Sequence, residues 1–205
     1  MVLEWRNKMK VYKLTDKKGK TKNGTSWGEN VTHEVTGALE LCKNGIHAYS
    51  DPLLAALHSS IHGQFDLSSA ILWKGKASNE HLDDNGMKSC HRWLKTVKKI
   101  PIPEISLTQK IAYGILCAKE VCDDKNWNKW ALLWLSGEDR SYAAADAAAY
   151  AAAHAAAYAA AHAAADADAD AAYAAYAAAA ASVAYDVRGK KIDLIKVAKK
   201  AMKVK

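Results

Sequence analysis

The sequence predicts an α+β protein, in which a small mixed-sheet N-terminal domain precedes helices and a long alanine-rich helical region. Short runs rich in β-branched and aromatic residues, separated by turn residues, fill residues 9–105 and indicate strands. From Ser106 onwards apolar residues recur at helical spacing, and Ala143–Ala181 contains 29 alanines in 39 residues. The predicted parts are an α+β domain over 1–105, a two-helix segment over 106–140, an alanine-rich helical region over 141–187 and a basic amphipathic helix over 188–205.

The first domain begins with an alternating strand at Lys10–Thr15, which the turn residues DKKGK end. A turn at Asn44-Gly45 then precedes a short apolar run. Asp51-Pro52 stops that run. Ser50 or Asp51 can cap the helix that follows, LLAALHSSIHG, which has Pro52 at its first position and extends to Gly63.

Further strands are predicted in SAILWKGKA and in SCHRWLKTVKKIPIPEISL. Pro101 and Pro103 suit the end or edge of a strand, because proline cannot donate to a sheet ladder.

Two helices follow. Ser106 and Gln109 have the spacing of a capping box, in which each side chain bonds the other residue's backbone N–H. Trp127, Trp130 and Trp134 share one face of the next helix, and Gly137 is suited to ending it. We expect this tryptophan stripe to lie in the core rather than to bind a ligand.

The alanine-rich region favours helix throughout, since alanine is the best helix former. One continuous helix from Ser141 to Tyr185 would be about 65 Å long, whereas a break near Asp166–Asp170 would give several shorter helices. Methyl-lined surfaces let helices approach closely. We expect this packing to occur between chains, giving a homo-oligomer, with folding back on the body as the alternative. The self-association residues are then Tyr150, His154, Tyr158, His162, Tyr173 and Tyr176.

No metal site is expected. His154 and His162 are eight residues apart, about 12 Å along a helix, and are too distant to share one ion. The cysteines Cys42, Cys90, Cys117 and Cys122 form no CxxC pair and are read as reduced thiols.

The net charge of +7 is unevenly distributed. Residues 1–140 carry +5, residues 141–186 carry −5, and residues 187–205 carry +7. A basic tail after an acidic segment can pair within the chain, so we expect no nucleic-acid partner. The tail helix has one lysine-rich and one apolar face, and we expect the apolar face to dock on the body.

The start of the chain has no apolar run typical of a signal peptide, and no stretch is suited to spanning a membrane. The reduced cytoplasm is therefore the expected compartment.

The stretch WGENVTHEVTGALELCKNGIHAYSDPLLAALHSSIHGQFD, with LWKGKA, DDNGMKS, IPIPEISLTQKIAYGILCAKEV and LSGEDRS after it, resembles an uncharacterised family of phage and prophage proteins. The likeness covers about Val11 to Ala181. It implies a phage accessory protein in the host cytoplasm, with a host protein or a nucleotide as partner, and it implies no catalytic residue.

The order of elements in residues 10–105 also resembles the ADP-ribosyltransferase-like fold. GIHAYSDPLLAALH would occupy a strand-helix position of that fold, and Glu104 a late-strand position as the catalytic carboxylate. The resemblance implies that nicotinamide lies near His33, Gly45, His47 and Tyr49. His47 replaces the expected aromatic residue, so an unrelated α+β domain with His47 in its core is the alternative.

These observations lead to three hypotheses. The first is a non-enzymatic accessory protein that binds a nucleotide or NAD-derived ligand near His47 and requires no other cofactor. The second is an ADP-ribosyltransferase that uses Glu104. The third is a purely structural, self-assembling protein.

Overall fold

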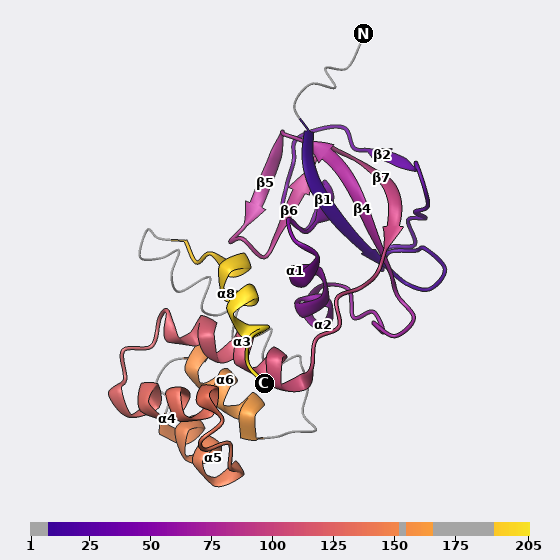
Figure 1. The fold of residues 1–205 in the computed structure, drawn as a ribbon. Helices are drawn as coiled ribbons and strands as arrows, with labels where there is room; N and C mark the ends of the chain where they lie inside the picture. Colours follow the sequence, from indigo (N-terminus) through magenta and orange to yellow (C-terminus); the bar gives the residue numbers. More distant parts are fainter. Residues whose placement is uncertain (1–7, 152–154, 166–190) are drawn as a thin grey trace. The chain divides into compact units, whose positions relative to one another are not determined.

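The computed structural model describes residues 8–151, 155–165 and 191–205. They form two compact units, Met1–Pro103 and Glu104–Lys205. The first unit contains the strands and two short helices, and the second is helical (Figure 1). The protein is therefore α+β, as the sequence predicts.

The first unit contains two antiparallel sheets. The larger has the order β1-β4-β7-β2. Its strands are β1 (Lys8–Thr15), β2 (Thr32–Glu34), β4 (Ile71–Ser78) and β7 (Trp93–Ile100). The smaller sheet has the order β3-β6-β5, with β3 (Ile46–Ala48), β5 (His81–Asp84) and β6 (Lys88–His91). Tyr12 and Tyr49 join the sheets through two backbone hydrogen bonds of 2.8 and 2.9 Å.

The core of this unit contains side chains from both sheets. Val11, Ala77 and Leu94 of the larger sheet belong to one buried cluster with Ile46 and Ala48 of β3. Trp27 and Trp73 complete the cluster. The Trp73 indole also donates a hydrogen bond of 3.1 Å to the Thr15 hydroxyl, which satisfies its buried N–H.

A bulge interrupts the pairing of β4 with β7. Lys74 pairs with Lys98 whereas Gly75 pairs with Thr96, so Val97 is the extra residue. A Cβ atom on Gly75 would lie 2.6 Å from the Lys95 carbonyl oxygen. Glycine is therefore required for this close approach of two backbones.

The helix predicted up to Gly63 is in fact two short helices, α1 (Pro52–Leu57) and α2 (Ser59–His62). Of the two candidate caps, Ser50 and Asp51, it is Asp51 that caps α1, because its carboxylate accepts from the Leu53 N–H at 2.9 Å. The break falls at His58, which has φ −98° and ψ 6° and a fully buried ring. The helix is therefore interrupted at a residue whose polar ring is buried.

The predicted late-strand position of Glu104 is wrong. β7 ends at Ile100, and Pro101 and Pro103 then remove two backbone donors from any continued ladder. Glu104 is an exposed residue at the beginning of the second unit, outside any strand.

The second unit is organised around α3 (Leu107–Lys119). The capping box of Ser106 and Gln109 is present, as predicted. Every residue from Ile111 to Ala118 is buried, as expected for a helix that has neighbours on all sides. These neighbours are α4 (Lys125–Ser136), α6 (Ala155–Ala165) and α8 (Leu194–Ala201).

The tryptophan stripe of α4 lies in the core, as expected, with Trp127, Trp130 and Trp134 buried. The Trp127 indole donates to the Ala157 carbonyl at 3.1 Å. Gly137 ends α4 in the left-handed conformation, with φ 83°.

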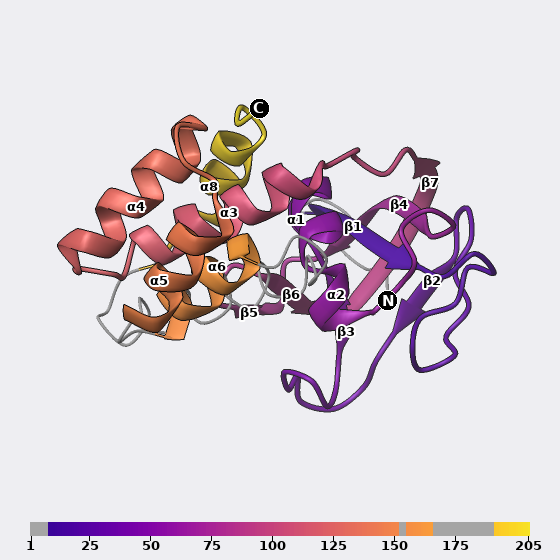
Figure 2. The ribbon, with the colours of Figure 1, turned by 90° about the horizontal axis from the view of Figure 1, so that it is seen from below.

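The alanine-rich region is not one continuous helix. α5 (Tyr142–Ala151) and α6 pack side by side, which a single straight helix cannot do (Figure 2). Their buried alanines are Ala145, Ala148, Ala149, Ala156, Ala157, Ala160 and Ala161. In this part of the region, therefore, the methyl surfaces are covered within the chain. The suggested break at Asp166–Asp170 lies outside the described residues.

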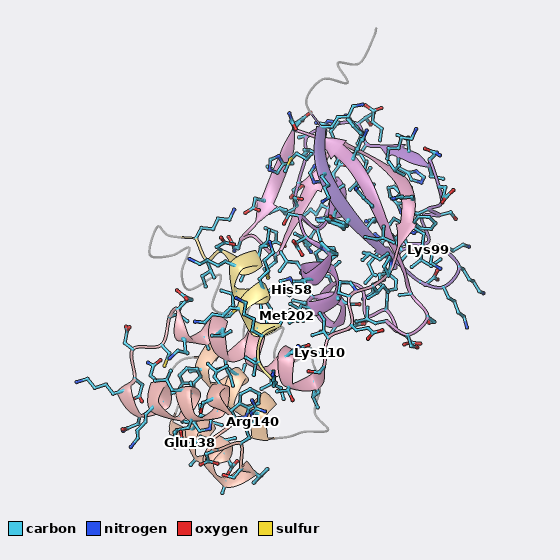
Figure 3. All side chains as sticks on the ribbon, in the orientation of Figure 1. His58, Lys99, Lys110, Glu138, Arg140 and Met202 are labelled. Carbon is cyan, nitrogen blue, oxygen red and sulfur yellow. The ribbon has the colours of Figure 1, made fainter. Side chains whose placement is uncertain are left out.

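The tail helix docks as predicted. Leu194, Val197, Ala198 and Ala201 are buried, and α8 contacts α3. Gln109 donates to the Met202 carbonyl at 3.0 Å, and Arg140 donates to the Lys205 carbonyl at 2.8 Å; Arg140 and Met202 are labelled in Figure 3. No helix among the described residues has the length and apolar character needed to cross a bilayer.

Candidate functional site

The first unit contains a cavity of about 390 Å³. Its walls come from β1, β2 and β3, the segment 21–27, residues around Gly63, and Lys88 of β6. The four residues predicted to bind a ligand, His33, Gly45, His47 and Tyr49, all line this cavity. The structure thus brings these four residues together, although they come from two separate parts of the chain.

Gly45 lies in the wall of the cavity, at a position where only glycine fits. Its φ is +146°, and a Cβ atom would lie 2.0 Å from the Cys90 Sγ atom. A larger residue would have to displace the buried Cys90. Glycine is therefore required at this position by the backbone and by Cys90, and the role of Gly45 in binding a ligand stays a prediction.

Trp27 and His33 form an aromatic pair at one side. Their ring centroids are 4.6 Å apart in an edge-on arrangement. His33 Nε2 donates to the Ser26 carbonyl at 2.8 Å, which fixes the orientation of the ring. Trp27 is 7% exposed, and its indole N–H has no hydrogen-bond partner within the described parts of the chain. The nitrogen itself is also buried, so a molecule in the cavity does not reach this donor in the present conformation.

Lys13 extends from β1 towards the cavity. Its ammonium donates to the His47 carbonyl at 2.6 Å and lies 5.4 Å from the centroid of the Trp27 ring. Burial, and then the positive charge of Lys88, lower the pKa of Lys13 to about 8. No carboxylate within 4 Å pairs with this amine among the described residues.

Lys88 brings a second amine to the wall. Its side chain is 12% exposed, and Asp84 lies 3.6 Å away. Lys88 also lowers the pKa of Lys13, His47 and His62. The positive charge of Lys88 therefore lowers the pKa of several groups around the cavity, although Asp84 lies nearby.

Two histidines of the cavity, His47 and His62, have lowered pKa values and are neutral at physiological pH. Burial, reinforced by Lys88, lowers the pKa of His47 to about 4 and that of His62 to about 3. His47 Nε2 accepts the Cys42 backbone N–H at 3.3 Å. The Tyr49 hydroxyl and His62 Nδ1 are hydrogen-bonded at 3.2 Å, and burial raises the pKa of Tyr49.

The lining is therefore rich in positive charge and in aromatic rings. It includes three lysines, Lys13, Lys22 and Lys88, against one carboxylate, Glu34, among the lining residues that the structure describes. Amines attract phosphate or carboxylate groups, and the aromatic rings offer surfaces to a planar group. The arrangement suits an anionic ligand that carries a flat ring.

Lys13, Trp27, His62 and Lys88 were not predicted as site residues. Lys13 carried a usable signal, because strand alternation places it on the same side of β1 as the buried Val11 and Thr15. A lysine on an inward-facing side of a strand is costly unless its amine has a hydrogen-bond or charged partner. Lys88 gave no comparable signal, since only the pairing of β6 with β3 brings it to the site.

The predicted self-association residues are not located at this site. Tyr150 lies in α5, and Tyr158 and His162 lie in α6, with side chains outside the described set. His154, Tyr173 and Tyr176 lie outside the described residues. Self-association through these six residues stays a prediction.

No cluster of three or more metal-binding side chains is found among the described residues. The four cysteines are free thiols, and Cys42 is the exposed one.

Comparison of the chain with protein-family models, with curated proteins and with solved structures gives no match. The resemblances to a phage family and to the ADP-ribosyltransferase-like fold therefore stay predictions. The function has to be inferred from the cavity itself.

Proposed function

We propose that this protein binds a small phosphate-bearing molecule, a nucleotide or an NAD-derived ligand, in the cavity of its first unit, as a non-enzymatic accessory protein. The observation that carries the proposal is the Lys13 amine. It faces the cavity beside a second amine and has a carbonyl oxygen as its partner.

A partly buried amine is stabilised in its charged form by a nearby anion. Burial and the charge of Lys88 lower the pKa of Lys13 to about 8, and no carboxylate within 4 Å of its amine offsets them among the described residues. A phosphate group between Lys13 and Lys88 would supply that negative charge. Binding would then raise the pKa of Lys13.

The base of a nucleotide matches the other part of the lining. Trp27, His33 and Tyr49 provide aromatic surface in the wall of the cavity. Stacking on aromatic rings tolerates any base, so this wall selects a planar group rather than one particular base.

The transferase hypothesis has lost its proposed catalytic residue, because Glu104 is not on the late strand that the resemblance requires. The setting of a phage accessory protein in the host cytoplasm rests on the sequence resemblance alone. Ligand binding in the cavity requires neither the transferase activity nor the phage setting.

Calorimetric titration with ADP-ribose, NAD, ATP and inorganic phosphate tests the proposal. Lys13→Met keeps the length of the side chain and removes its charge, and we expect affinity to fall at least tenfold. Wild-type affinity should also fall between pH 7 and pH 9, because Lys13 loses its proton near pH 8. This pH dependence should be absent in Lys13→Met.

Lys43→Met is the matched control, since Lys43 lies in the same unit and its side chain is 74% exposed. It should bind like the wild type. Binding that is equal in Lys13→Met and Lys43→Met would contradict the proposal, as would no binding of any of the four compounds. Transfer of label from NAD to protein would instead favour the enzyme.

A further inference from the structure

A second feature of the first unit is a lysine-bearing surface on the larger sheet. We call it the lysine face. It comprises Lys8, Lys10, Lys74, Lys76, Lys95 and Lys98, from β1, β4 and β7. These strands lie side by side in Figure 1, and most of the six side chains border a shallow depression of about 510 Å³.

The register of the sheet aligns these lysines in rows. Lys10 pairs with Lys76, and Lys76 pairs with Lys95, so three lysines lie directly opposite one another on adjacent strands. Lys74 pairs with Lys98 in the next row. Paired residues point to the same face of a sheet. Neighbouring rows are about 6.8 Å apart and neighbouring strands about 4.8 Å apart.

The lysines of this face repel one another. The pKa of Lys8 is lowered first by burial and then by the charges of Lys76 and Lys95. Like charges directly opposite in a sheet are destabilising. None of the ion pairs found in the described regions includes Lys10, Lys74, Lys76, Lys95 or Lys98. The pKa of Lys10 is raised, first by its interaction with the Tyr12 side chain and to a smaller extent by the Asp51 carboxylate.

We propose that the lysine face binds the phosphate backbone of nucleic acid, without sequence preference. Closely spaced amines in two directions match a polymer that carries a charge on every repeat. Lysine contacts phosphate as a point charge and reads no base pattern from this position. Bound phosphates would also relieve the repulsion within the Lys10–Lys76–Lys95 row.

Two other partners fit the face less well. Protein interfaces are depleted in lysine and are centred on apolar anchors. Lysines alone attract anionic lipid only weakly, and stable membrane binding also uses large apolar side chains that insert into the bilayer. The exposed large hydrophobic residues in the described part of the chain are Leu82, Leu107, Leu132 and Tyr142, and none lies on this face.

This proposal departs from the expectation that no nucleic acid is bound. That expectation considered the basic tail and the net charge, whereas the lysine rows arise from strand pairing. The proposal is also independent of the cavity. Lys13 points to the opposite side of β1 from Lys8 and Lys10, because successive side chains alternate.

Fluorescence anisotropy with a labelled 20-base-pair DNA duplex tests the proposal. The wild-type affinity should fall steeply between 50 and 200 mM salt, with a slope of log K against log salt of about −5 for six phosphate contacts. The triple variant Lys10→Gln/Lys76→Gln/Lys95→Gln should lose at least tenfold in affinity at 50 mM salt. Its slope of log K against log salt should be less negative than that of the wild type by about 3.

The triple variant Lys17→Gln/Lys18→Gln/Lys20→Gln is the matched control. It removes the same charge from exposed residues of the same unit, whose local hydrogen bonds use backbone N–H groups. It should bind DNA like the wild type, as should Lys13→Met. The lysine-face variant should melt at or above the wild-type temperature, because removing opposed charges relieves repulsion.

Equal loss of affinity in the two triple variants would overturn the proposal, since net charge alone would then explain binding. Binding of poly-glutamate as tight as that of DNA, or binding to anionic phospholipid vesicles with none to DNA, would overturn it in favour of another partner.

Discussion

His58 connects α1 and α2 with its ring fully excluded from solvent. Burial lowers its pKa to about 4 against the opposing effect of a Met87 backbone hydrogen bond, and Lys88 lowers it further. His47 and His62 have similarly low pKa values, about 4 and about 3. Three residues near one cavity are therefore neutral in the folded protein at pH values where free histidine is charged.

These histidines make stability depend on pH. Between pH 6.5 and the folded pKa, the unfolded chain takes up protons that the folded chain does not, so acid favours unfolding. For His58 alone we expect the free energy of unfolding to fall by about 2 kcal/mol from pH 6.5 to pH 4.5. Urea unfolding followed by tryptophan fluorescence measures this change.

His58→Gln isolates the contribution of one ring. Glutamine does not titrate, so the variant should be less stable at pH 7 but should lose less stability on acidification. Parallel stability curves for the two proteins over this pH range would contradict the low pKa of His58.

The elements show why the alanine-rich region needs small residues. Ala156, Ala157, Ala160 and Ala161 of α6 are all buried, and α6 contacts both α3 and α5. Methyl side chains leave the backbone of α6 accessible, so the Trp127 indole reaches the Ala157 carbonyl. Close packing here takes place within one unit of one chain.

Ala160→Leu should therefore destabilise the second unit, because the added atoms have no space. Overpacking a close-packed interior costs about 1–3 kcal/mol. The control is Ala147→Leu, at an exposed position of α5, where leucine and alanine have nearly equal helix propensity. Thermal unfolding should show a lower transition for the first variant and an unchanged one for the second. Equal transitions would mean that Ala160 is not tightly packed.

Across the whole molecule, the sequence predicted those features that depend on local chemistry. The caps at Asp51, Ser106 and Gly137 and the burial of the tryptophan stripe follow from short-range rules, and they are confirmed. The predicted ligand-binding residues His33, Gly45, His47 and Tyr49 came instead from the resemblance to the ADP-ribosyltransferase-like fold, and the structure places all four in the wall of one cavity.

Features that depend on pairing or on uniform composition were not predictable. Lys13 and Lys88 meet at the cavity only because β1 and β6 lie on either side of β3. The exposed β5 lacks the apolar alternation that reveals a strand. In the alanine-rich region most positions are alanine, so local propensity does not predict that α5 and α6 pack side by side as separate helices.

The predicted homo-oligomer is a question for the whole molecule. The buried alanines of α5 and α6 need no second chain, so an interface must use other surfaces, such as the tyrosine and histidine positions named above. Light scattering at micromolar concentration should give a multiple of 22.2 kDa if self-association occurs. A mass of 22.2 kDa over the full concentration range would exclude it. Ala160→Leu is unsuitable as an interface variant, because that residue is internal.

The central position of α3 has a consequence for synthesis of the chain. The helix ends at Lys119, whereas α8 begins at Leu194, 75 residues later. At 5–20 residues per second, the ribosome needs about 4 to 15 s to add that length. The described strands of the first unit, which end at Ile100, have all been synthesised before this interval begins. α3 meanwhile lacks the cover of α8 over an apolar surface, and this interval is when a nascent chain would most need a chaperone.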